Sequence, residues 1–200
     1  MSQSGEILVI TGPMRGKKSD LLIIELEQAV IAEKRVVAFK PFKDTRSGDE
    51  IVSRRFNEEG ESEVSRRFPA MPVKTPLDMQ KIIDWKQPEI VGIDEGQFLN
   101  EQFVSFVKRM SDTRGIEFII SGLDMDYLGK PFGKTMPGFL AIAHKVRKTQ
   151  AICYRCKSRN AIFTQKIAGS TAQVEVGDVE YRAACRECWY PYRGERRASN

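Results

Sequence analysis

The sequence predicts an α/β fold with a parallel sheet, followed near the C-terminus by a small unit that binds a metal. Three observations support this prediction. Short β-branched apolar runs alternate with segments of helical periodicity through most of the 200 residues. Glycine or aspartate directly follows three of the four apolar runs, at Gly12, Asp94 and Gly122, as in βα turns. From about Lys148 the alternation stops, and two Cys-x-x-Cys pairs begin a different kind of unit.

The composition is that of a globular chain, with 41% hydrophobic and 30% charged residues. No apolar run approaches the roughly 18 residues that a membrane span needs. Residues 1–6 lack the basic-then-apolar pattern of a signal peptide. We therefore expect a cytoplasmic protein with no membrane partner. The net charge of +5 mildly favours anionic ligands but is too small to indicate nucleic acid.

The first elements are expected before residue 68. Glu6–Thr11 (EILVIT) has the apolar composition of a buried strand, which Gly12 and Pro13 would end. From Ser19 to about Glu33 apolar residues recur at helical spacing, and Val36–Phe39 is expected to be a second buried strand. Residues 43–67 are polar and charged and contain two glycines, so we expect a mobile excursion there.

The alternation continues further along the chain. Pro76–Trp85 is expected to be a helix with proline in its first turn, followed by a third strand at Glu89–Ile93. Phe98–Met110 carries an apolar stripe typical of a helix, and Ile116–Ser121 is the fourth expected strand. Ligands gather at the carboxyl ends of parallel strands, so the residues that follow these strands are the candidates for a site.

The four cysteines give the strongest chemical signal. Cys153 and Cys156 form one Cys-x-x-Cys hook, and Cys185 and Cys188 form another. Two such hooks can place four thiolates around one tetrahedral Zn²⁺. Disulfide or redox use of the same residues is the alternative, but pairing within Cys-x-x-Cys is strained and nothing indicates secretion. A four-cysteine site has no open coordination position, so its expected role is structural.

A phosphate-binding turn is expected after the first strand, where the chain reads GPMRGKKS (12–19). In the motif G-x-x-x-x-G-K-[ST], backbone N–H groups cradle the phosphates, lysine reaches the terminal ones and the hydroxyl binds Mg²⁺. Gly12, Lys18 and Ser19 are in register, whereas Lys17 occupies the place of the second glycine and Gly16 comes one position early. The strand before and the helix after favour phosphate binding over a simple basic turn.

Two acidic residues, Asp94 and Glu95, end the third expected strand. One carboxylate there can hold a Mg²⁺ that bridges phosphates, and its neighbour can take a proton from an attacking hydroxyl. Alone the pair would read as a solvated acidic loop, but the phosphate-binding turn favours the functional interpretation.

Other features are less specific. The segment 123–133 follows the fourth strand and interleaves apolar residues that would suit a flat ring ligand, although a surface loop is the simpler interpretation. His144 is expected on a helix face without a catalytic role. Two groups of basic residues are expected to be solvated, with a nucleic-acid contact as the alternative. The first comprises Lys145, Arg147 and Lys148, and the second, near the end of the sequence, comprises Arg193, Arg196 and Arg197.

Taken together, these segments resemble the thymidine kinases of the cellular and bacterial cytosolic type, also called type II, from about Ile7 to Tyr192. The resemblance is carried by GPM followed by Lys-Ser (12–19), KPFKDTR (40–46), IDEGQF (93–98), GLDMDYLGKPFG (122–133) and C-x-x-C…FTQK…YRAACREC (153–188). It implies a P-loop (RecA-like) domain over residues 1–148 and a small zinc-binding lasso domain over residues 149–200. It also implies a homotetramer.

The resemblance implies deoxynucleoside salvage by transfer of the γ-phosphate of ATP, with Mg²⁺, to the 5′-hydroxyl of thymidine. By position, Glu95 would be the general base. The nucleotide side of the site would comprise Gly12, Pro13, Met14, Arg15, Gly16, Lys17, Lys18, Ser19, Asp44, Arg46, Asp94 and Gln97. The nucleoside side would comprise Met14, Phe98, Leu123, Tyr127, Phe132, Thr164, Val174, Val176 and Tyr181, with the lasso running through residues 165–184.

The phosphate-binding turn departs from the family. Family loops resemble GPMFSGKS, whereas this chain has Arg15, Gly16 and Lys17 in place of Phe, Ser and Gly; Lys166 also stands where arginine is frequent. Glycine is used where backbone must approach phosphate or take a conformation costly for other residues, so sterics at Lys17 oppose phosphate binding while its charge favours it. An impaired, kinase-like protein that binds nucleoside or nucleotide without turnover is therefore the alternative to an active kinase. A zinc-ribbon nucleic-acid binder is a third hypothesis, resting on the cysteine pairs and modest basicity.

Overall fold

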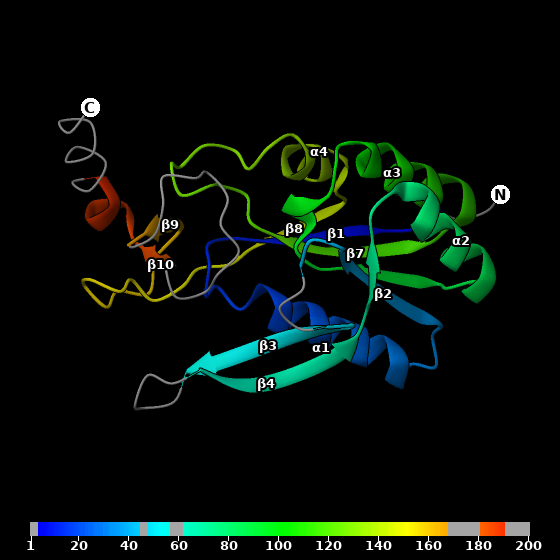
Figure 1. Ribbon diagram of the computed structural model, residues 1–200, viewed down its shortest axis with the longest axis horizontal. Coiled ribbons are helices and arrows are strands. Elements are labelled where there is room, and N and C mark those ends of the chain that lie inside the picture. Colours follow the sequence, from blue (N-terminus) through cyan, green and yellow to red (C-terminus); the bar gives the residue numbers. More distant parts are fainter. Residues whose placement is uncertain (1–3, 45–47, 57–61, 168–180, 191–200) are drawn as a thin grey trace.

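The computed structural model describes residues 4–44, 48–56, 62–167 and 181–190, and it contains one central sheet with helices on both faces (Figure 1). A β-hairpin packs on one of these helices, and a two-stranded sheet lies at one end of the molecule. Among the described residues, no helix combines the length and apolar character that crossing a bilayer requires.

The central sheet has six described strands in the order β5-β2-β6-β7-β1-β8. Every neighbouring pair is parallel. The predicted parallel α/β fold is therefore confirmed. The strands are β1 (Ile7–Thr11), β2 (Val36–Pro41), β5 (Met71–Val73), β6 (Ile90–Ile93), β7 (Glu117–Gly122) and β8 (Lys145–Lys148).

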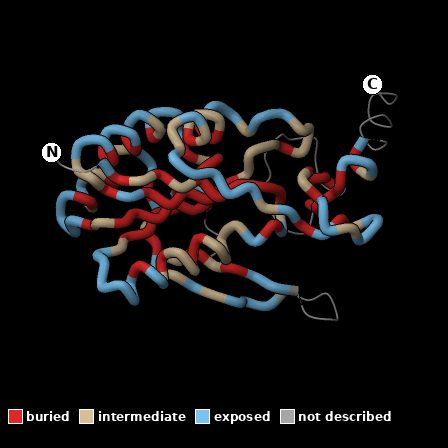
Figure 2. Tube along the Cα trace, turned by 180° about the vertical axis from the view of Figure 1, so that it is seen from behind, coloured by how far each residue is buried: buried red, intermediate tan, exposed pale blue. Residues whose placement is uncertain are grey.

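Burial on both faces explains why the central strands are continuous apolar runs. Val9 and Ile10 are neighbours on β1, so their side chains point to opposite faces, yet neither is exposed. Val9 packs in the core beneath three helices, and Ile10 packs in the core beneath one. Figure 2 shows the buried residues concentrated along these strands.

Helices cover the two faces unequally (Figure 1). One face carries α1 (Lys18–Ile31), whose buried Leu22 and Leu26 pack against the sheet. The other face carries α2 (Pro76–Lys86), α3 (Gln102–Arg114) and α4 (Thr135–Ile142). The helix expected from Phe98 begins later, because η1 (Gly96–Phe98) is a separate 3-10 turn.

The mobile excursion expected at residues 43–67 is largely a β-hairpin instead. β3 (Glu50–Phe56) and β4 (Ser62–Pro69) pair antiparallel and pack on α1. Buried Ile51 enters the apolar core beneath α1, and Arg66 pairs with Asp20 at 3.4 Å and with Glu27 at 2.7 Å. The exposed charged side chains of the hairpin obscure the alternation of polar and apolar residues by which a strand is recognised in the sequence.

Two further expectations are corrected near the edge strand β8. His144 lies in the turn after α4, not on a helix face, and its Nδ1 accepts the Ile7 N–H at 3.1 Å. The basic residues 145–148 are exposed, as expected, but they form a strand whose cations are in ion pairs. Arg147, for example, pairs with Glu25 on α1 at 2.7 Å.

Candidate active site and metal centre

Three segments converge at the carboxyl edge of the sheet because β6, β7 and β1 are neighbours in it. Residues 12–19 follow β1, residues 94–98 follow β6 and residues 122–133 follow β7. The predicted juxtaposition of the phosphate-binding turn with the acidic pair follows from this order.

The glycines of the phosphate-binding turn are required by close packing against Thr149. The Thr149 hydroxyl donates to the Thr11 carbonyl at 3.0 Å. A Cβ on Gly16 would lie 2.7 Å from Thr149 Oγ1 and 2.9 Å from the Pro13 carbonyl, and a Cβ on Gly12 would also clash with Thr149. Thr149 carried no signal in the sequence, yet it explains the glycine at position 16.

The neighbouring positions of the turn hold non-glycine residues in left-handed backbone. Arg15 has φ 62° and Lys17 has φ 60°, and both side chains are exposed. This conformation costs a side-chain-bearing residue about 1–2 kcal/mol. α1 nevertheless begins at the next residue, and its first bond runs from the Leu21 N–H to the Lys17 carbonyl at 3.0 Å.

The turn and the acidic strand end meet through hydroxyl groups. Ser19 Oγ donates to Asp94 Oδ1 at 3.2 Å, and Ser121 Oγ donates to the same oxygen. Lys18 Nζ donates to the Pro13 carbonyl at 2.8 Å. Ser19 and Asp94 are thus in contact, as the sequence predicted, and Lys18 precedes Ser19 at the start of α1. Ser121 was missed, although a hydroxyl at the end of an apolar strand in this sheet was the available signal.

The buried Asp94 carboxyl has an unusual protonation equilibrium. It is 6% exposed. Burial raises the pKa of Asp94 to about 6; repulsion from Glu95 adds to the rise, and the hydrogen bond from Ser121 opposes it. A cation beside this carboxylate would favour its charged form.

Glu95 is held by Gln97, two residues further along the chain. Gln97 Nε2 donates to Glu95 Oε2, and Gln97 Oε1 accepts the Leu123 N–H at 3.0 Å. The backbone of Glu95 is left-handed, with φ 51°, a strained conformation that is often found at functional sites. These contacts connect the end of β6 with the segment that follows β7.

The aromatic residues that the resemblance assigns to the nucleoside make contacts of two kinds. Phe98 and Phe132 meet edge to face, with ring centroids 5.8 Å apart. Lys166 is 1% exposed, and its Nζ lies 5.6 Å from the Tyr127 ring centroid and 5.8 Å from that of Tyr181. The buried Lys166 thus contacts the rings of two residues that the resemblance assigns to the nucleoside.

The small sheet is connected to the phosphate-binding turn. It consists of β9 (Phe163–Lys166) and β10 (Tyr181–Ala184), which pair antiparallel. Thr164 Oγ1 on β9 accepts the Met14 N–H at 3.0 Å, so two residues expected to surround the base are in contact.

Some expected site residues are not joined to this cluster by any of these contacts. Asp44 follows β2 and is buried, where it pairs at 3.4 Å with Lys40. Lys40 is 1% exposed and was missed, although a lysine that ends an apolar strand was a visible signal. Arg46, Val174 and Val176 lie outside the described residues.

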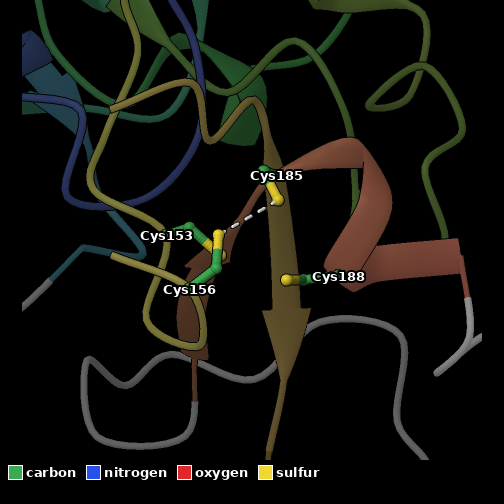
Figure 3. Close-up of side chains that lie close together, drawn as sticks. All are labelled: Cys153, Cys156, Cys185 and Cys188. Carbon is green, nitrogen blue, oxygen red and sulfur yellow. Dashed lines mark hydrogen bonds between the residues drawn. The ribbon is translucent and has the colours of Figure 1, made fainter. Parts of the chain in front are cut away.

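Four cysteines converge from two segments beside the small sheet (Figure 3). Their sulfur atoms all lie within 4.8 Å of one another, and those of Cys156 and Cys185 are 3.6 Å apart. Tetrahedral Zn²⁺ with bonds of about 2.3 Å requires sulfurs about 3.8 Å apart. The hydroxyl of Ser158 lowers the pKa of Cys156 to about 6, whereas the hydrogen bond with Cys185 raises the pKa of Cys188 to about 12, so the fit to a metal rests on the sulfur geometry. The cluster therefore fits a structural zinc ion.

The metal centre is packed against the segment after β7. Trp189 follows Cys188 and stacks on Phe163, with ring centroids 4.4 Å apart and an interplanar angle of 12°. A Cβ on Gly129, which has φ 71°, would lie 2.6 Å from the indole ring of Trp189. The metal centre can therefore stabilise the position of the 123–133 segment through Trp189.

Comparison with known proteins gives one consistent family. A family model described as thymidine kinase matches residues 5–189. A thymidine kinase of Mesomycoplasma hyopneumoniae (strain 7448) is 38% identical over 186 residues, which cover 92% of this chain and 95% of that relative. A thymidine kinase of Bacteroides thetaiotaomicron is 36% identical over 192 residues, covering 96% of this chain and 90% of the relative. A thymidine kinase of Mycoplasmoides gallisepticum is 33% identical over 189 residues, covering 92% and 80%.

Proposed function

The chain belongs to the thymidine kinase family, and from this premise we propose that it transfers the γ-phosphate of ATP to the 5′-hydroxyl of thymidine. The observation that supports the proposal best is the contact of Ser19 with Asp94 beside Glu95, where a phosphate-binding turn meets two carboxylates. We also propose that the protein is a cytoplasmic homotetramer with a nucleotide-binding domain over residues 1–148 and a zinc-binding lasso domain over residues 149–200.

On the nucleotide side, Lys18 would exchange the Pro13 carbonyl for the terminal phosphates of ATP. The oxygen ligands that Mg²⁺ prefers are present in the Ser19 hydroxyl and the Asp94 carboxylate, which would hold the ion with ATP. When bound, the ion neutralises phosphate charge as the transfer proceeds.

On the nucleoside side, the rings of Phe98, Tyr127, Phe132 and Tyr181 would pack against a pyrimidine. Glu95 would accept the proton of the 5′-hydroxyl as that oxygen bonds to the γ-phosphorus. The bond from this phosphorus to the bridging oxygen breaks, and ADP leaves with the electron pair. Positioning and charge neutralisation supply most of the catalysis in such transfers.

The hypothesis of a kinase-like protein without turnover rested on Lys17, and the family matches do not favour it over an active kinase. Of the basic residues considered for nucleic acid, those of β8 are engaged in ion pairs within the chain, and Arg193, Arg196 and Arg197 lie outside the described residues.

Transfer of labelled phosphate from ATP to thymidine tests the proposal on zinc-loaded protein. Glu95→Gln should lower kcat by at least about 100-fold, the usual contribution of a general base. Glu101→Gln is a matched control, because Glu101 is an exposed glutamate at the start of α3. Absence of transfer by folded, zinc-loaded wild-type protein would refute the proposed activity, and full activity of Glu95→Gln would remove the role of the base.

A further inference from the structure

The side-chain amide of Gln97 is engaged at both ends. It is 5% exposed and sits in η1, directly after β6. Its Nε2 donates to the Glu95 carboxylate, and its Oε1 accepts the backbone N–H of Leu123 at 3.0 Å. Only a side chain with both a donor and an acceptor in this geometry satisfies both partners.

The slot that holds this amide is built from small and apolar neighbours. A Cβ on Gly122 would lie 2.8 Å from Gln97 Oε1 and 2.7 Å from Met136 Sδ, so any side chain at position 122 would displace the amide. A Cβ on Gly96 would lie 3.1 Å from Ile120 Cγ2. Close packing on these sides fixes where the amide can lie.

The Gln97 amide binds Glu95, the residue whose orientation matters most for the proposed reaction. Glu95 has left-handed backbone, φ 51°, and its carboxylate accepts the Gln97 N–H at one oxygen. That hydrogen bond fixes the orientation of the carboxylate relative to the backbone of η1. A base must lie within hydrogen-bond reach of the proton that it accepts, so a fixed carboxylate raises the turnover rate.

We propose that Gln97 is a positioning residue that orients the Glu95 base and couples it to the nucleoside-binding segment through the Leu123 N–H. The inference rests on the proposed kinase function and goes beyond it. It replaces the expectation that Gln97 binds ATP with a role that operates entirely through Glu95.

Substitution by Gln97→Met, which keeps the length but removes both hydrogen bonds, tests the role in the zinc-loaded protein. We expect kcat to fall about 10–100-fold, in the range of a misplaced catalytic group, with the KM for ATP unchanged within a factor of about 2. Gln102→Met is the matched control, because Gln102 is an exposed glutamine at the start of α3. A raised KM for ATP with unchanged kcat would instead establish nucleotide binding and overturn the inference.

A double-mutant cycle distinguishes action through Glu95 from an independent effect. If Gln97 works only by aiming Glu95, then Glu95→Gln/Gln97→Met should have the kcat of Glu95→Gln alone. Multiplying losses would overturn the inference while leaving the proposed function intact.

The contact itself can be tested without turnover, which keeps the inference testable even if the proposed activity fails. Gln97→Glu places two carboxylates together and should lower the melting temperature by about 2–4 °C, the shift expected for loss of one such interaction in a chain of this size. The exchanged pair Glu95→Gln/Gln97→Glu restores an amide–carboxylate contact, so the melting temperature should recover. A double variant no more stable than Gln97→Glu would show that the contact does not exist.

Discussion

Replacing Asp94 by asparagine should stabilise the ligand-free protein, although it removes a proposed Mg²⁺ ligand. The folded chain buries this carboxyl to 6% exposure, and burial raises its pKa from 3.8 to about 6. The folded state therefore holds the proton more tightly than the unfolded state does. Stability is lost as the pH rises from about 4 to 6, and the whole cost is present at neutral pH.

The magnitude follows from the difference in pKa between the two states. A shift from 3.8 to about 6 corresponds to about 3 kcal/mol at 1.36 kcal/mol per unit. Asparagine is neutral at every pH and keeps an oxygen that can accept from Ser19 and Ser121. We expect Asp94→Asn to be more stable by about 3 kcal/mol at pH 7.5 and by less than about 1 kcal/mol at pH 4.

Urea unfolding of both proteins at these two pH values, without nucleotide or Mg²⁺, measures the effect. Asp112→Asn is the control; Asp112 is an exposed carboxylate on α3, paired with Lys108, and its replacement should change stability by at most about 0.5 kcal/mol. The reasoning fails if Asp94→Asn is not more stable at pH 7.5, or if its gain is the same at both pH values.

Three further predictions concern the turn, the buried lysine and the metal. Lys17→Gly should raise the free energy of unfolding by about 1 kcal/mol, measured by urea unfolding, because it relieves left-handed backbone; a loss of stability would contradict the strain. Lys166→Met should raise the KM for thymidine, while Lys166→Arg should largely preserve it. If the two variants have the same KM for thymidine, a positive charge at position 166 is not required. Chelation of zinc, or Cys188→Ser, should lower the melting temperature by several degrees and weaken thymidine binding; unchanged melting would exclude a structural metal.

The buried strands of the sheet could be predicted because burial on both faces favours one sequence pattern, a continuous apolar run. β1 and β6 are covered on both faces, so every position favours an apolar side chain and the run is visible in the sequence. The hairpin and β8 could not be predicted in this way. Arg54, Arg55 and Arg67 of the hairpin are exposed, and the four residues of β8 are all exposed.

The same distinction applies to the candidate site. Contacts that follow from the order of the strands could be predicted, whereas contacts that depend on the orientation of a side chain could not. The approach of Ser19 to Asp94 follows from parallel strands whose carboxyl ends share an edge, so it could be predicted. The bond from Leu123 to Gln97 joins residues 26 positions apart and depends on which way an amide turns in a packed slot. Nothing in the pattern of residue types specifies that orientation.

The phosphate-binding turn shows how a motif can shift while its backbone requirements remain. Position 16 needs glycine because Thr149 and the Pro13 carbonyl leave no room for a Cβ. Position 17 takes left-handed backbone, which lysine adopts at a cost of about 1–2 kcal/mol. Since the Lys17 carbonyl still accepts the first hydrogen bond of α1, the strain has not displaced the start of the helix. The turn therefore keeps Lys18 and Ser19 at the start of α1, facing the acidic end of β6, and the exposed cations of Arg15 and Lys17 add positive charge where a triphosphate would bind.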